Sequence, residues 1–368
     1  MTDQHGGRTG GTVEVEASTA ARNPAPSTSP SASAAEPCLP VSGNSTADSE
    51  VVTGPPDAAV FLAHLAAGAD PFDLVQRPDW FSYTAFDTFA RCPRRYALRY
   101  LCRQPEQLII WPAAEFGAAA HAAFETFTRE RRERAARGEP PPTRADLGGF
   151  FREAFGRTSL VSGPDPESWL ARAQPMLDLF WSGEQPVEHS TEEASIATAN
   201  SASGDGPASP AASAVAPVRS VAGFPDTIGE EMRFGLALEL DKESSVRVTG
   251  FIDRVDRLPS GEVEVIDYKS GNGWSGGAAG SLQLAIYALG CRDALGLGRP
   301  ASVGLYFVEA GLRARAERTD RELDGLRLDL AARARAIRSS TFAPTPGDRN
   351  CRWCEFAAEC DAAATEAR

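Results

Sequence analysis

The chain has 368 residues, enough for one large domain or two small ones, and 42% of them are hydrophobic, which suffices for a sizeable core. Its formal net charge of −13 argues against broad, non-specific adhesion to nucleic acid or to an anionic membrane, but leaves room for a local basic groove. We find no signal peptide and no apolar run as long as a membrane span, so we expect a soluble cytoplasmic protein.

Composition divides the chain into five segments. Residues 1–55 and 183–225 are rich in small and polar residues without hydrophobic periodicity, which predicts a disordered tail and a long flexible insertion. Residues 56–182, between them, predict a helical part. Residues 226–340 predict an α/β core, and residues 341–368 form a segment that contains a cysteine cluster.

The first ordered segment, residues 82–103, predicts two helices that meet at Cys92-Pro93. Ser82 suits an N-cap, and Pro93 suits the first turn of the second helix. Basic residues with tyrosines nearby suit a nucleic-acid backbone and stacked bases, although a solvated helix face explains them equally well. The arginines of this candidate DNA-binding face are Arg91, Arg94, Arg95, Arg99 and Arg103.

A longer helix is predicted for residues 115–138, where Phe116, Phe124 and Phe127 follow helical spacing. His121 lies on the same broad side, where a lone histidine is usually a packed core residue. Glu125 follows one turn later and is a candidate accessory acid.

The stretch from Gly250 to Ser270 reads GFIDRVDRLPSGEVEVIDYKS and predicts a β-hairpin with its turn near Pro259. Asp253 lies on the first strand, and Asp267 and Lys269 share one face of the second. Carboxylates are the natural ligands of Mg²⁺, and a neighbouring lysine can orient water or offset charge on a phosphate. A surface hairpin with an ordinary Asp–Lys pair is the simpler alternative.

Two further groups follow the hairpin. Residues 281–294 predict a helix on which Gln283 and Tyr287 share a face, either as polar surface or as part of a site. The C-terminal run CRWCEFAAEC holds three of the chain's seven cysteines, a strong signal for a metal or a cluster, but no fourth ligand lies nearby in sequence. These cysteines are Cys351, Cys354 and Cys360.

Asp253 followed by Asp267-Tyr268-Lys269 resembles the catalytic core of the PD-(D/E)XK nuclease superfamily, closest to the RecB-like domain and its relatives in AddB and the CRISPR adaptation nucleases. Ile266 replaces the proline of the superfamily's name, at a position that varies in the RecB-like branch. The resemblance implies an α/β fold of the restriction-endonuclease type, with a mixed central sheet flanked by helices. It also implies that Asp253 and Asp267 bind Mg²⁺ or Mn²⁺.

The same resemblance gives roles to the other groups. It places His121 at the metal, Lys269 at the attacking water, and the helix of Gln283 and Tyr287 beside the site. It joins Cys92, by its Cys-Pro motif, to the three C-terminal cysteines around a [4Fe–4S] cluster that clasps the two ends of the domain. Cys102 is the fallback fourth ligand, and Zn²⁺ in the same thiolates is the alternative metal.

The function implied is a metal-dependent DNA nuclease, specifically an exonuclease of DNA repair or recombination that acts on single strands or DNA ends. A helicase subunit is a candidate partner, and it would be a separate protein because we find no nucleotide-binding P-loop in this sequence. The alternative is a non-catalytic DNA-binding or scaffolding subunit of a helicase–nuclease complex.

Overall fold

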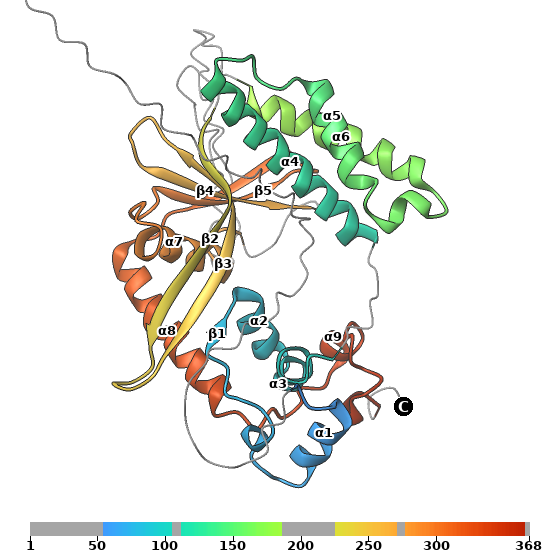
Figure 1. Ribbon diagram of the computed structural model, residues 1–368, viewed down its shortest axis with the longest axis vertical. Helices are drawn as coiled ribbons and strands as arrows, with labels where there is room; N and C mark the ends of the chain where they lie inside the picture. The colour runs from blue at the N-terminus through green and yellow to red at the C-terminus, as the bar shows by residue number, and fades with distance from the viewer. Residues whose placement is uncertain (1–53, 105–111, 186–224, 271–276, 365–368) are drawn as a thin grey trace, which may run out of the picture. The chain divides into compact units, whose positions relative to one another are not determined.

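The computed structural model describes residues 54–104, 112–185, 225–270 and 277–364 (Figure 1). These residues belong to one unit that begins at Ala47. The predicted tail and insertion therefore lie almost wholly outside the described residues. The helices are α1 (Ala58–Ala66), η1 (Pro71–Asp73), α2 (Tyr83–Arg91), α3 (Pro93–Tyr96), η2 (Ala97–Leu101), α4 (Pro112–Arg137), α5 (Arg144–Phe155), η3 (Ser159–Ser162), α6 (Pro166–Glu184), α7 (Leu282–Asp293), α8 (Asp320–Arg338), α9 (Asp348–Cys351) and α10 (Asp361–Ala364).

Strand β3 pairs with three other strands of the sheet, and the predicted hairpin of β3 and β4 lies at the centre of the sheet. The strands are β1 (Trp80–Phe81), β2 (Asp226–Glu239), β3 (Ser245–Arg257), β4 (Val263–Lys269), β5 (Ser302–Phe307) and β6 (Leu312–Ala316). β2 pairs with β3 along nearly its whole length, antiparallel. The other edge of β3 is therefore shared by β1, parallel near the start of β3, and by β4, antiparallel near its end. β4 then pairs with β5 in parallel, and β5 with β6 antiparallel.

Helices flank the sheet (Figure 1). Two hydrophobic cores join these helices to the strands. Helices α4, α5 and α6 bury their aromatic side chains against Tyr268 and Tyr306 in one core. Helices α7 and α8 pack against Val265 and Leu305 in the other, which also contains Phe86 of α2. Strand residues alternate between these cores because side chains of a strand point to opposite faces. The predicted mixed sheet flanked by helices is confirmed.

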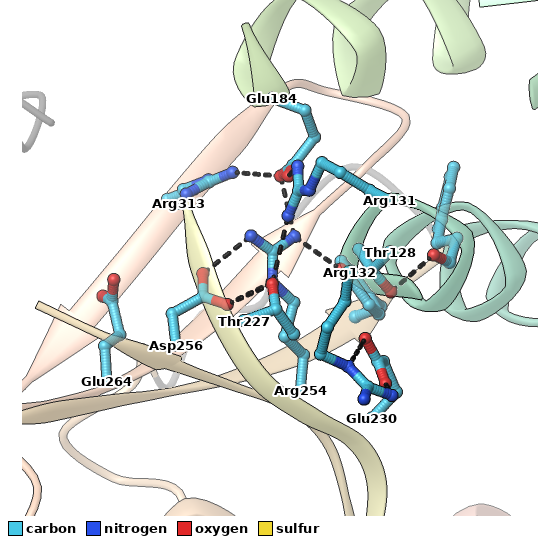
Figure 2. A network of polar contacts seen from close by, with 12 residues as sticks. Thr128, Arg131, Arg132, Glu184, Thr227, Glu230, Arg254, Asp256, Glu264 and Arg313 are labelled. Atoms are coloured by element: carbon cyan, nitrogen blue, oxygen red, sulfur yellow. Dashed lines mark hydrogen bonds and ion pairs between the residues drawn. The ribbon is translucent and has the colours of Figure 1, made fainter. Parts of the chain in front are cut away.

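A network of buried charges joins α4 and α6 to the sheet (Figure 2). Arg254 is fully buried, and its guanidinium donates two hydrogen bonds of 2.7 Å to Asp256 while its Nη1 lies 2.8 Å from Glu184. Arg131 of α4 contacts the other oxygen of Glu184 at 2.6 Å and donates to the Thr227 hydroxyl at 3.0 Å. The network satisfies charges that would be costly to bury alone.

This network reaches the two strands of the hairpin. Arg254 also donates to the Tyr268 hydroxyl at 3.1 Å, and Arg313 of β6 contacts Glu184 at 3.2 Å. Arg254 directly follows Asp253, and Tyr268 stands between Asp267 and Lys269. The backbone of the predicted metal-binding residues is therefore fixed from the other side of each strand.

Candidate active site

The two predicted acids lie where strands β3 and β4 separate. The ladder between the strands ends at the pair Arg254↔Ile266, so Asp253 and Asp267 occupy the next position on each strand. The Asp253 carboxylate accepts a hydrogen bond of 2.8 Å from the Tyr268 N–H, across the opening. The opening therefore places both carboxylates side by side without a backbone ladder between them.

Lys269 connects this pair of acids to helix α7. Its Nζ lies 2.6 Å from Asp267 Oδ2 and donates to Gln283 Oε1 at 3.0 Å. Gln283 Nε2 in turn donates to the Tyr287 hydroxyl at 2.8 Å. The four residues thus form one continuous chain of polar contacts, in which Gln283 and Tyr287, spaced one helical turn apart, hold the Lys269 ammonium over the site.

Helix α4 brings His121 to the same opening. Its Nδ1 lies 3.5 Å from Asp253 Oδ2. The helix approaches the end of β4 so closely that a Cβ at Gly117 would lie 2.7 Å from the Ser270 hydroxyl, which explains the glycine at this position of the helix. Burial lowers the pKa of His121 and outweighs the attraction of Asp267, so the imidazole is neutral at pH 7.

The electrostatics of the site favour a cation. Burial raises the pKa of Asp267 to about 7, with a further rise from Asp253, and burial raises the pKa of Asp253 to about 6. Asp267 Oδ2 is buried and has no hydrogen bond of regular geometry in the described part of the chain, only the ion pair with Lys269. A divalent ion would remove the repulsion between the two carboxylates.

Ligand geometry for such an ion is only partly formed. Among the described residues, no group of three or more histidine, cysteine, aspartate or glutamate side chains is close enough to hold a metal. Mg²⁺ usually takes one or two carboxylates and completes its shell with water and phosphate oxygens. The paired acids therefore fit a magnesium or manganese site that substrate and water complete.

Sequence analysis missed a third acid at this opening, Glu231 of β2. The flanking pairs of the β2–β3 ladder place it opposite Asp253, and its backbone has a φ of 46°, uncommon for any residue except glycine. Burial raises the pKa of Glu231 to about 7, with further contributions from Asp253, Glu125 and Asp267. Glu125 itself is paired with Arg129 at 2.6 Å. In the sequence, the only indication of this acid was the pair Glu230-Glu231, which comes directly before the alternating residues of β2.

The predicted DNA-binding arginines have protein partners. Arg95 and Arg99 lie 2.5 and 3.6 Å from Glu355, and Arg91 lies 2.8 Å from Asp87. Arg94 donates to the Phe342 carbonyl at 3.0 Å. These contacts fasten α3 and η2 to the C-terminal segment. Arg103 lies just after η2 and, like Arg91, is exposed.

The predicted cluster cysteines line one pocket. Cys92 lies between α2 and α3, and Cys351, Cys354 and Cys360 reach the same pocket from the C-terminal segment. All four are free thiols in the structure. Cys102 is not among the lining residues; it is buried elsewhere, and burial raises the pKa of its thiol to about 12. Cys102 therefore lies apart from the four lining thiols, which are not gathered into a metal-binding group in the described part of the chain.

Similarity to known proteins is found in a family model and in a solved structure. The family model of the PD-(D/E)XK nuclease superfamily matches residues 80–361. A solved structure described as "Crystal structure of SSO0001" is similar at 12% identity, covering 83% of this chain and 95% of that chain with a TM-score of 0.32. The search of curated proteins finds no match. Along the described residues, no helix combines the length and apolar character needed to cross a membrane.

Proposed function

Because this chain belongs to the PD-(D/E)XK nuclease superfamily, we propose that it is a Mg²⁺- or Mn²⁺-dependent deoxyribonuclease, acting as an exonuclease in DNA repair or recombination. The observation that carries the proposal is the position of Asp253, Asp267 and Lys269 at the point where β3 and β4 separate. Members of the superfamily are generally nucleases that use divalent metal ions.

The acids and the histidine would hold the ion. Asp253 and Asp267 provide the carboxylate oxygens, and the neutral imidazole of His121 faces Asp253. When bound, a divalent cation polarises a phosphoryl oxygen and stabilises the charge that develops on the leaving oxygen. The Tyr268 N–H keeps one Asp253 oxygen fixed, so the carboxylate is oriented before substrate arrives.

Lys269 would position the attacking water and offset negative charge at phosphorus. The Lys269 side chain is 37% exposed, so it can reach substrate while Asp267 and Gln283 hold its ammonium group. Gln283 Oε1 accepts a hydrogen bond from the Lys269 ammonium, and Gln283 Nε2 donates one to the Tyr287 hydroxyl, which orients the remaining N–H bonds of the ammonium. Gln283 and Tyr287 are therefore proposed as positioning residues.

The four pocket cysteines would hold a [4Fe–4S] cluster, with Zn²⁺ as the alternative. Four thiolates are the ligand set of such clusters, and these four come from segments far apart in sequence. A cluster here would tie the region of α2 and α3 to the C-terminal segment, next to the ion pair of Arg95 with Glu355. Its role would be structural.

Cleavage of end-labelled single- and double-stranded DNA tests the enzyme assignment, with Mg²⁺, Mn²⁺ or a chelator. We expect metal-dependent cleavage by the wild type, and a loss of roughly 10²-fold or more in Asp267→Ala and Lys269→Ala. Asp226→Ala, an exposed carboxylate on β2, is the matched control and should cleave normally. Unchanged cleavage in Asp267→Ala would refute the site.

Two further measurements separate the remaining alternatives. Iron, sulfide and zinc analysis of anaerobically purified protein distinguishes the cluster from zinc, and Cys92→Ser should lose the metal whereas Cys102→Ser should keep it. A folded wild type that binds DNA but never cleaves it, even with a partner helicase and ATP, would favour the non-catalytic subunit.

A further inference from the structure

One face of the sheet carries exposed side chains along β1, β2 and the first half of β3. On β2, Phe234, Leu236 and Leu238 point into the core, whereas the residues between them are exposed. The same alternation holds on β3, where Val246 and Val248 are buried and their neighbours are not. The outer face is thus a regular strip rather than scattered surface positions.

Cross-strand pairing aligns the residues of this strip. Arg247 lies between Trp80 of β1 and Ala237 of β2, and Phe251 lies opposite Arg233. Residues directly opposite one another share a face of the sheet. Trp80 is 40% exposed and Phe251 is 44% exposed, which is unusual for such large apolar rings.

Both arginines lie beside these rings. The Arg233 guanidinium is 5.9 Å from the centre of the Phe251 ring. A Cβ at Gly235 would lie 3.4 Å from Arg247 Cδ, so the glycine makes room for the arginine stem to lie flat across β2. No ion pair to Arg247 is found among the described residues, and none of the residues paired between 233–237 and 247–251 is acidic.

The strip ends at the candidate active site. Asp253 follows Phe251 by two residues on β3, a distance of about 7 Å along the strand. Because β2 is antiparallel to β3, Glu231, two residues before Arg233, lies at the level of Asp253. A chain lying along the strip therefore reaches the separated ends of β3 and β4 without crossing another element of the sheet.

We propose that this face of β1, β2 and β3 is the approach track for single-stranded DNA, whose bases stack on Trp80 and Phe251 and whose phosphates contact Arg233 and Arg247. Exposed aromatics interleaved with cations suit unpaired bases, because stacking needs a free base face. A second copy of this face would place arginines against arginines, which repel. The bases of a duplex are stacked on one another, so they could not stack on Trp80 and Phe251. The inference rests on the proposed nuclease function and names its substrate path.

Stacking is tested by fluorescence anisotropy with labelled oligothymidylate in the presence of chelator, which prevents cleavage. Phe251→Ala is expected to raise Kd about 5-fold to 100-fold, the range found for loss of one base–aromatic stack. Leu328→Ala on α8 removes a side chain that is 72% exposed and should bind like wild type. Phe251→Trp should retain binding, because it preserves the aromatic face.

The phosphate contact is tested by salt dependence. Arg247→Ala should reduce the slope of log Kd against log salt by about 0.7, the value for one phosphate contact on a single strand. Arg321→Ala, another exposed arginine, is the control and should keep the wild-type slope. Binding of a blunt duplex should be unchanged in Phe251→Ala, and an equal loss on duplex would overturn the stacking assignment.

Failure of this inference differs from failure of the proposed function. A wild type that cleaves DNA with Mg²⁺, together with Phe251→Ala and Arg247→Ala that bind single strands as it does, would overturn the track and leave the nuclease intact. A wild type that neither binds nor cleaves DNA would overturn both. Thermal melting of each variant shows that a loss of binding is not a loss of folding.

Discussion

Strands β3 and β4 carry two clusters of charge at alternating positions, and the clusters differ in how their charges are balanced. In the network around Arg254, Glu184 and Asp256, every buried side-chain oxygen and nitrogen has a partner (Figure 2). At the opening between the strands, Lys269 is paired with Asp267, and both Asp253 and Asp267 have raised pKa values. The charges of the first cluster are balanced within the fold, whereas those of the second would be balanced by the cation that we propose.

The comparison shows how one pair of strands serves stability and chemistry together. Alternation sends Arg254 and Tyr268 to the network and Asp253 and Asp267 to the site. The satisfied cluster holds the backbone of both strands from the other side, and this supports the geometry of Asp253 and Asp267 in addition to their own contacts with Tyr268 and Lys269. Removing a charge from the first cluster should therefore lower the stability of the fold, whereas removing one from the second should raise it.

The largest effect is expected from Glu184→Gln, which leaves three arginines facing a neutral amide. We expect a loss of about 3–5 kcal/mol in unfolding free energy at pH 7. Burial would raise the pKa of Glu184, but Arg254, Arg131 and Arg313 outweigh it and hold the pKa at about 2, below the usual 4.5. The stabilisation is present above pH 4.5 and lost as the pH falls towards 2.

Urea unfolding at pH 7 and at pH 3 measures this effect. The difference between wild type and Glu184→Gln should be smaller at pH 3. Glu153→Gln is the control, because Glu153 is an exposed member of an i,i+4 pair with Arg157 and should change stability by less than about 0.5 kcal/mol. Equal effects of the two variants would show that the buried network does not stabilise the fold.

A middle-sized effect is expected from Gln283→Leu, which removes the acceptor that holds Lys269. We expect kcat/KM for DNA cleavage to fall about 10-fold to 100-fold, the usual cost of losing a supporting contact at a metal site. Tyr287→Phe keeps Gln283 but removes the hydroxyl beneath it, so its effect should be smaller. An unchanged Kd for DNA in chelator would separate positioning from binding, and wild-type kcat/KM in Gln283→Leu would exclude the role.

The smallest effect is expected from Asp267→Asn, and its sign is reversed. The pKa of Asp267 is raised in the folded protein, so the charged form costs stability as the pH rises from about 4 to about 7. In chelator at pH 8 the variant should be more stable, on the order of 1 kcal/mol, because one pKa unit corresponds to about 1.4 kcal/mol and the Lys269 ion pair is lost. The gain should vanish near pH 4, and a loss at pH 8 would contradict the interpretation.

Local sequence was sufficient for the elements that carry the site. The turn near Pro259 and the alternating strands predicted the hairpin, and the spacing of two residues predicted that Asp267 and Lys269 share a face. Helical spacing likewise predicted that Gln283 and Tyr287 share a face of α7, where Gln283 donates to the Tyr287 hydroxyl. These are short-range relations, fixed by the period of a strand or a helix.

Relations between distant segments could not be predicted in the same way. Composition assigned Glu184 to the flexible insertion, whereas α6 ends at Glu184 and buries it completely, because its partners lie far away on α4, β3 and β6. Arg95 and Arg99 looked like a basic face because Glu355 is distant in sequence. The sequence did not indicate the outer strip either. Trp80 and Arg247 are distant in sequence, and only the pairing of β1 with β3 brings them together.

One contact of the buried network has a consequence for protein engineering. Arg131 bonds both Glu184, just before residues 186–224, and Thr227, just after them, so the chain on both sides of that segment is held by contacts that do not involve it. The entropy of closing a loop grows only slowly with its length. We therefore expect that a reporter domain or an affinity module inserted between Glu184 and Thr227 will leave the described fold intact.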